Sequence, residues 1–253
     1  MSPLILLTND DGYFAAGLRA LARSLKRAGD VFIVAPDREK SAASLALTLR
    51  HPLRVEKAGP RTFAVDGTPA DCVYLAVAKL LPRRPALLVS GINHGPNLGR
   101  QDIAYSGTVS GALQGTFLGI PSVAMSLAPD TEKRFGFDAA AEFAARLAGA
   151  VLRDGLPAGV MLNVNLPPGP VKAVEFTELG EKRYDPEVVE KRDPRERTYY
   201  WIGLGKISPS GGRRSDVRAV ERGSVSITPL HTDRTDRRAL ASPALKKALQ
   251  ELF

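Results

Sequence analysis

The sequence predicts an α/β fold in which a mostly parallel sheet lies between two layers of helices. Short apolar runs without polar alternation recur along the first 167 residues, as is typical of strands that are covered on both faces. Segments with helical length and periodicity separate these runs. Strands and helices that alternate in this way form crossover connections, which make neighbouring strands parallel.

The predicted elements follow one another in a regular order. Strands are expected at 4–7, 31–36, 86–91, 121–127 and 160–166, and helices at 17–29, 69–81, 106–119 and 137–155. The second of these helices has the clearest start. Thr68 can cap it, Pro69 suits its first position, and Asp71 places a negative charge in its first turn.

The pattern changes after residue 167, where proline, glycine and charged residues become frequent. The elements expected there are strands at 199–203 and 224–230, a flexible loop over 205–216 and a closing amphipathic helix over 242–253. We therefore divide the chain into a core of residues 1–167 and a C-terminal extension of residues 168–253.

Composition excludes several classes of protein. Of the 253 residues, 44% are hydrophobic and 25% are charged, which is the balance of a globular protein and not of a disordered one. The single cysteine, Cys72, allows no intrachain disulfide and no thiolate zinc site, which fits a reducing compartment. The apolar run over 4–7 is too short for a signal peptide or a membrane span. We therefore expect a cytoplasmic protein that does not contact a membrane.

The formal net charge of +8 suits an anionic partner such as a nucleotide, a nucleic acid or phosphate. The basic residues are concentrated in the last third of the chain, however, where a solvated surface is the simpler interpretation. No interleaved aromatic and basic pattern or known nucleic-acid motif accompanies the charge, so binding of nucleic acid is not expected.

Two adjacent aspartates, Asp10 and Asp11, follow the first predicted strand. Ligands of an open parallel sheet bind beyond the carboxyl ends of its strands, so both carboxylates lie where a ligand is expected. Adjacent carboxylates repel each other, and a divalent cation such as Mg²⁺ relieves that repulsion. The alternative is that one aspartate caps a helix that begins near Ala15 or Ala16, while the other is solvated.

Further polar residues follow the other predicted strands. After the third strand come Asn93, Asn97, Ser106, Gly107 and Thr108. The last three begin a helix, whose free amides attract phosphate. Capping is the commoner role of such residues in general, but beside a carboxylate pair at the same edge of the sheet we favour phosphate binding. The segment after the second strand adds Ser41, whose hydroxyl alone would indicate only a cap or a surface group.

Six motifs, in this order and at these spacings, resemble the SurE family, the survival protein E nucleotidases: TNDDG, VAPDREKSA, VDGTPADCVYL, SGINHGPNLG, YSGTVSGALQG and SITPLH. The resemblance implies a Rossmann-like three-layer core and a C-terminal arm that is exchanged between the subunits of a homodimer or homotetramer. It also implies a phosphatase that depends on a divalent metal ion, Mg²⁺ or Mn²⁺, and hydrolyses nucleoside 5′- and 3′-monophosphates.

The resemblance also implies roles for individual residues. The family's metal ligands correspond to Asp10, Asp11, Ser41 and Asn97, and its substrate-binding shell corresponds to Asn9, Asn93, Ser106, Gly107 and Thr108. Asp10 and Asp11 are then the catalytic residues. We favour attack by a metal-activated water, and attack by one of the aspartates is the alternative.

Other functions fit parts of this pattern less well. A phosphoacceptor receiver domain needs a third aspartate after the middle strand, where this chain has Asn93. A zinc-dependent deacetylase needs a histidine before the aspartates, where this chain has Thr8, and a later His-x-x-His pair that the sequence lacks. The alternative to a nucleotidase is a phosphate- or nucleic-acid-binding protein of the same fold without that activity. Of the histidines, each expected to be structural, His231 is the one we would test as a proton donor or phosphate contact.

Overall fold

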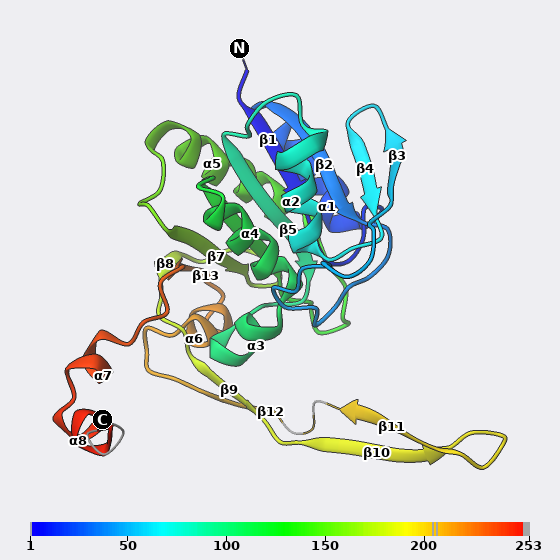
Figure 1. Ribbon diagram of the computed structural model, residues 1–253. Helices are drawn as coiled ribbons and strands as arrows, with labels where there is room; N and C mark the ends of the chain where they lie inside the picture. Colours follow the sequence, from blue (N-terminus) through cyan, green and yellow to red (C-terminus); the bar gives the residue numbers. More distant parts are fainter. Residues whose placement is uncertain (1, 204, 206, 250–253) are drawn as a thin grey trace.

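The computed structural model describes residues 2–203, 205 and 207–249. At its centre is a nine-stranded sheet with the order β3-β4-β2-β1-β5-β6-β7-β13-β8 (Figure 1). Its strands are β1 (Leu4–Thr8), β2 (Asp30–Pro36), β3 (Val55–Gly59), β4 (Thr62–Val65), β5 (Leu87–His94), β6 (Ser122–Leu127), β7 (Val160–Leu166), β8 (Val174–Phe176) and β13 (Val225–His231). The six strands from β4 to β7 in this order pair in parallel, whereas β3 and β13 are antiparallel to β4 and β7. The predicted mostly parallel α/β fold is confirmed.

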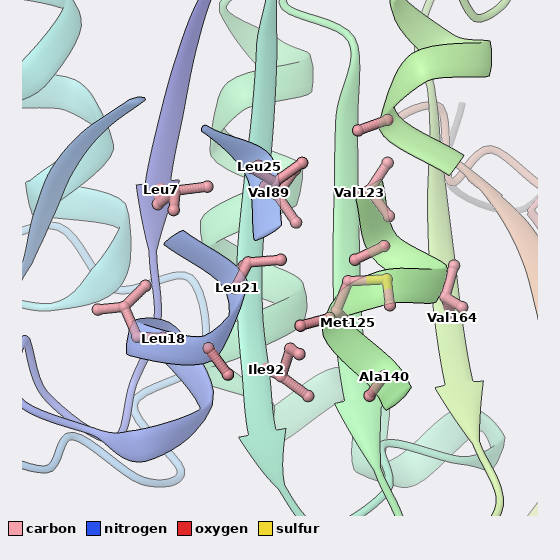
Figure 2. Packing of buried hydrophobic residues seen from close by; sticks show 14 of the residues in the cluster. Leu7, Leu18, Leu21, Leu25, Val89, Ile92, Val123, Met125, Ala140 and Val164 are labelled. Carbon is pink, nitrogen blue, oxygen red and sulfur yellow. The ribbon is translucent and has the colours of Figure 1, made fainter. Parts of the chain in front are cut away.

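Helices cover both faces of the sheet. One layer consists of α1 (Ala16–Leu25) and α5 (Phe137–Asp154). The other consists of α2 (Pro69–Leu75), its π-helical continuation η1 (Ala76–Leu80), and α4 (Gly107–Phe117). Figure 2 shows Leu18, Leu21 and Leu25 of α1 among buried side chains of the central strands, such as Val89 and Met125. The spacing of these leucines places them on one side of the helix, which explains why α1 buries that side.

Helix α4 packs closely against the sheet through a face that carries three glycines. Gly107, Gly111 and Gly115 are spaced four residues apart and therefore share one face. A Cβ atom at Gly111 would lie 2.8 Å from Ser90 Oγ, and one at Gly115 would lie 2.5 Å from Ser122 Oγ. A larger residue at either position would force these neighbours to move. The close packing brings the N-terminus of α4 to the carboxyl ends of β1 and β5.

The extension adds smaller elements. Two antiparallel pairs are formed by β9 (Glu181–Tyr184) with β12 (Ile207–Ser210) and by β10 (Glu187–Arg192) with β11 (Thr198–Gly203). Figure 1 shows the β10–β11 ribbon projecting away from the nine-stranded sheet. The helices outside the two layers are α3 (Gly99–Tyr105), α6 (Asp216–Glu221), α7 (Arg237–Ala241) and α8 (Pro243–Leu249).

The extension contains elements that were not expected, namely β8, β9, β10, β12, α6 and α7. The predicted flexible loop over 205–216 contains β12 and the start of α6, so that prediction was wrong for these residues. Strand β12 forms because it pairs with β9, a partner distant in the sequence that local composition does not reveal.

The closing helix is confirmed for Pro243–Leu249, and residues 250–253 lie outside the described part. Strands β8 and β13 join the main sheet, and the division at residue 167 stays a prediction.

No helix in the described part of the chain combines the length and apolar character that a bilayer span requires.

Candidate active site

A cavity of about 1190 Å³ lies at the carboxyl ends of β1 and β5. Most of the predicted site residues line it, namely Asp10, Asp11, Ser41, Asn93, Asn97 and Ser106. The other three predicted residues, Asn9, Gly107 and Thr108, are buried next to this group. The structure therefore brings together side chains from four separate motifs of the sequence.

Asp10 is the most enclosed of the acidic residues at the cavity, with 6% of its surface exposed. The hydroxyl of Thr108 donates a hydrogen bond to Asp10 Oδ1. Gly107 packs so closely that a Cβ there would lie 2.7 Å from Asp10 Cβ. Burial raises the pKa of Asp10 to about 6; the hydrogen bond from Thr108 opposes this rise, and the charge of Asp11 adds to it. Gly107 and Thr108 thus contact Asp10 directly.

Asp11 contacts a histidine. Its Oδ2 atom lies 2.9 Å from His94 Nδ1 and 3.4 Å from the main-chain nitrogen of the same residue. The hydrogen bond to Asp11 raises the pKa of His94. Phe135 and Phe137 hold the imidazole edge-on, with ring centroids 5.2 and 4.9 Å away.

The histidine beside the aspartates is therefore His94 and not His231, the one chosen from the sequence for testing. His94, which the sequence indicated as structural, lines the cavity beside the aspartates. His231 lines a separate cavity of about 680 Å³, where its Nδ1 accepts a hydrogen bond from the amide of Asp233 at 2.8 Å.

The alternative role of the aspartates as helix caps does not occur. Helix α1 begins at Ala16, and no side chain caps it. The turn before it is closed by Asn9, whose Nδ2 donates to the carbonyl of Gly12 at 2.9 Å. Gly12 has a φ of 102°, a value that side chains rarely adopt, which accounts for glycine at this position.

The loop that carries Ser41 is attached to the core on both sides of this residue. The amide of Lys40 donates to the carbonyl of Asp10 at 2.8 Å. Ser44 contacts the end of α3 through its amide, 3.1 Å from the carbonyl of Tyr105, and its hydroxyl, 2.7 Å from that of Ala104. Ser41 itself is exposed at the cavity.

The side-chain nitrogens of Asn93, near the end of β5, and of Asn97, in the loop that follows, both donate hydrogen bonds. Asn93 Nδ2 donates to the carbonyl of Gly95 at 2.9 Å, and Asn97 Nδ2 donates to Ser126 Oγ at 2.8 Å. With the nitrogen occupied in this way, the amide oxygen is the atom that each side chain can offer to a ligand.

The extension supplies another wall of the cavity, formed by Lys182, Tyr184, Asp185, Pro186, Ile202 and Gly203. Asp102 of α3 anchors this wall, because its carboxylate lies 2.6 Å from Lys182 Nζ and accepts a hydrogen bond from the Tyr184 hydroxyl. Burial and the contact with Asp102 raise the pKa of Tyr184. The sequence did not reveal this wall, since Asp102 and Lys182 lie 80 residues apart.

The residues at the cavity fit a hard divalent cation. The candidate ligands Asp10, Asp11, Ser41 and Asn97 offer only oxygen atoms, which Mg²⁺ and Mn²⁺ prefer. Next to them, Asn9 Oδ1 is buried without a hydrogen-bond partner in the structure. Within the described residues, no three His, Cys, Asp or Glu side chains gather to hold a metal. The two aspartates would therefore need the neighbouring hydroxyl and amide oxygens.

Comparison with known proteins gives a consistent result. The family model "Survival protein SurE" matches residues 5–186. A 5′-nucleotidase SurE from Geotalea daltonii is 50% identical over 246 residues, which cover 96% of this chain and 98% of that protein. One from Anaeromyxobacter dehalogenans is 52% identical over 235 residues, which cover 91% of each protein. The crystal structure of the SurE protein from Aquifex aeolicus matches with a TM-score of 0.82 at 40% identity and covers 97% of this chain and 100% of that one.

Proposed function

This chain belongs to the SurE family, and on that premise we propose that it hydrolyses nucleoside 5′- and 3′-monophosphates with a Mg²⁺ or Mn²⁺ ion bound at Asp10 and Asp11. The chain is a nucleotidase, since relatives of about 50% identity over nearly its whole length carry that name. The observation that supports the metal site is Asp10, a nearly buried carboxylate that is adjacent to a second carboxylate at the cavity.

The proposed ligands are Asp10, Asp11, Ser41 and Asn97. Asn93 is a second candidate for the amide ligand. It precedes His94, which contacts Asp11, and its side-chain nitrogen donates a hydrogen bond to the carbonyl of Gly95. A divalent ion bound there supplies charge neutralisation for phosphate and lowers the pKa of a bound water.

Residues of the chain itself orient the Asp10 carboxylate and stabilise the negative charge of a bound phosphate group. Thr108 and Gly107 fix the position of the Asp10 carboxylate. Ser106 lines the cavity and its Oγ accepts from the amide of Val109, so its hydroxyl proton is free to be donated to a phosphate oxygen. The N-terminus of α4 favours negative charge at the same place.

The shape of the cavity supports a substrate larger than phosphate. Its volume of about 1190 Å³ leaves room for a nucleoside beside a phosphate group at the aspartates. Apolar and aromatic groups that can pack against a base line it as well, among them Phe14, Tyr105, Pro186 and Ile202.

We also propose that the protein is a cytoplasmic homodimer or homotetramer with an exchanged C-terminal arm. The β10–β11 ribbon exposes large apolar side chains, including Val188, Trp201 and Ile202, and subunit contact would cover them. Helices α7 and α8 lie apart from the main sheet in Figure 1, as an arm that reaches a neighbour would. The buried free thiol of Cys72 is compatible with a reducing compartment. Light scattering that shows a single chain at micromolar concentration would contradict the assembly.

The activity is tested by phosphate release from a panel of nucleoside 5′- and 3′-monophosphates, in EDTA and with added Mg²⁺ or Mn²⁺. We expect release that requires metal and is lost in Asp10→Asn. Asp138→Asn is the matched control, because Asp138 is an exposed aspartate on α5 outside the cavity. Release that persists in EDTA, or in Asp10→Asn with metal, would contradict the proposed metal site.

A binding experiment distinguishes Asn97 from Asn93 as the amide ligand of the metal ion. Isothermal titration of Asn97→Ala and Asn93→Ala with Mn²⁺ should show a greater loss of affinity for the variant that lacks the ligand. Binding of nucleotide without any hydrolysis would favour the non-enzymatic alternative.

A further inference from the structure

The loop between β5 and α3, residues 95–98, lies on three fully buried polar side chains. They are Ser126 of β6 and Asn163 and Asn165 of β7, each 0% exposed. Ser126 and Asn165 are paired in the register of the sheet, and Asn163 lies two residues before Asn165 on the same face of β7. The three side chains therefore form one polar patch near the carboxyl end of these strands.

All three side chains bind a single residue of the loop, Asn97. Asn165 accepts a hydrogen bond from the main-chain nitrogen of Asn97 at 2.7 Å and donates one to its carbonyl at 3.0 Å. Asn163 donates a second hydrogen bond to that carbonyl, also at 3.0 Å. Ser126 accepts a hydrogen bond from the Asn97 side chain at 2.8 Å. The amide of Asn165 thus pairs with the Asn97 main chain as a neighbouring strand would.

This arrangement is costly in a strand that is otherwise apolar. Met161 precedes Asn163 on the same face of β7, Leu162 and Val164 lie on the other face, and burying an amide in this sheet costs free energy unless it is hydrogen-bonded. Asn163 Oδ1 is buried without a hydrogen-bond partner in the structure, so part of that cost is not recovered. What the asparagines provide is a fixed position for the main chain of Asn97.

The position of the Asn97 main chain affects the arrangement of the residues that line the cavity. The segment that ends at Asn97 begins with Asn93 and His94, and all three line the cavity. His94 also contacts Asp11 through its ring and its amide. If the main chain at Asn97 moved, the amide oxygens offered to a metal ion would move relative to the aspartates.

We propose that Asn165, together with Asn163 and Ser126, is a positioning residue of the metal site, which sets the affinity for the divalent ion by fixing the main chain of Asn97. This proposal rests on the metal site of the proposed function. Groups that orient metal ligands typically account for about 10–100-fold in metal affinity.

The test measures Mn²⁺ binding to the full chain, freed of metal, by isothermal titration, together with hydrogen–deuterium exchange of the peptide over 93–98 in EDTA. Asn165→Leu removes both contacts with the Asn97 main chain at similar volume. Ser126→Ala removes only the side-chain contact. Ser122→Ala is the matched control, because Ser122 is an equally buried serine of β6 that binds the carbonyl of Ile120, away from the loop.

For Asn165→Leu we expect Mn²⁺ affinity to fall by about 10–100-fold and exchange over 93–98 to become faster. Ser126→Ala should show a smaller loss, and Ser122→Ala should bind Mn²⁺ as the wild type does. If Asn165→Leu does not fold, the proposal is tested by comparing the Mn²⁺ affinities of Ser126→Ala and Ser122→Ala. Equal Mn²⁺ affinity in wild type and Asn165→Leu, or in the two serine variants, would overturn the proposal and leave the metal site intact. A wild type that binds no Mn²⁺ would instead overturn the metal site of the proposed function.

Discussion

Replacing Asp10 by asparagine is expected to abolish hydrolysis and, at the same time, to stabilise the metal-free protein. The reason is that Asp10 is nearly buried and has a pKa of about 6 in the folded chain, against the ordinary value of 3.8. The ionised carboxylate is therefore less stable in the folded protein than in the unfolded one. Asparagine keeps the shape and an oxygen that can accept the Thr108 hydrogen bond, but carries no charge.

The sign and size of the effect follow from linkage. Between pH 4 and 6 the folded chain retains a proton at Asp10 that the unfolded chain has lost, so the stability of the wild type falls as pH rises through this range. At about 1.4 kcal/mol per pKa unit, a rise of about 2 units lowers the free energy of unfolding of the wild type by about 3 kcal/mol above pH 6. For a chain of this length each kcal/mol moves Tm by about 2–4 °C. Part of the gain is offset because asparagine must also be buried.

The assay is thermal unfolding in EDTA from pH 4 to pH 8. We expect Asp10→Asn and wild type to be equally stable near pH 4, and the variant to melt several degrees higher above pH 6. Added Mn²⁺ should stabilise the wild type and not the variant. A variant that is less stable than wild type at pH 8 in EDTA would refute this account of Asp10.

Three further predictions concern other parts of the molecule. Gly107→Ala places a Cβ 2.7 Å from that of Asp10, so we expect a loss of about 1–3 kcal/mol in denaturant unfolding and a drop in kcat; unchanged kcat would show that the contact is not needed. Asp102→Ala leaves the Lys182 ammonium, whose side chain is 15% exposed, without its partner. We expect a higher KM for nucleotides and faster proteolysis of the β9–β12 region, and an unaltered KM would argue against a substrate wall there. Val188→Lys introduces a charge on the exposed ribbon, away from the cavity, and light scattering should show a smaller assembly; an unchanged mass would place the subunit contact elsewhere.

The sequence was sufficient for the layered core because its signals are local. Continuous apolar runs predicted the central strands, and segments of helical length and periodicity predicted the helices between them. Strands β9 and β12 were missed because each forms only by pairing with the other, and neither is apolar enough to be recognised alone.

The site was partly predictable for a similar reason. Asp10 and Asp11 were found because two adjacent carboxylates at the end of a buried strand are unusual in themselves. The role of His94 depends on a contact with Asp11 across 83 residues of chain, which no local pattern shows. Asn163 and Asn165 did leave a signal, since two asparagines two residues apart in an apolar strand place two amides on one buried face.

The cavity is lined by residues of the core and by residues of the extension. The core supplies the carboxylates, with Thr108 and Gly107 fixing Asp10, whereas residues between Lys182 and Gly203 form the opposite wall. In the proposed function, a substitution in that wall would alter the surface presented to a nucleoside without touching the contacts of Asp10. Such a substitution is therefore expected to change which nucleotides bind while leaving the contacts that position Asp10 intact.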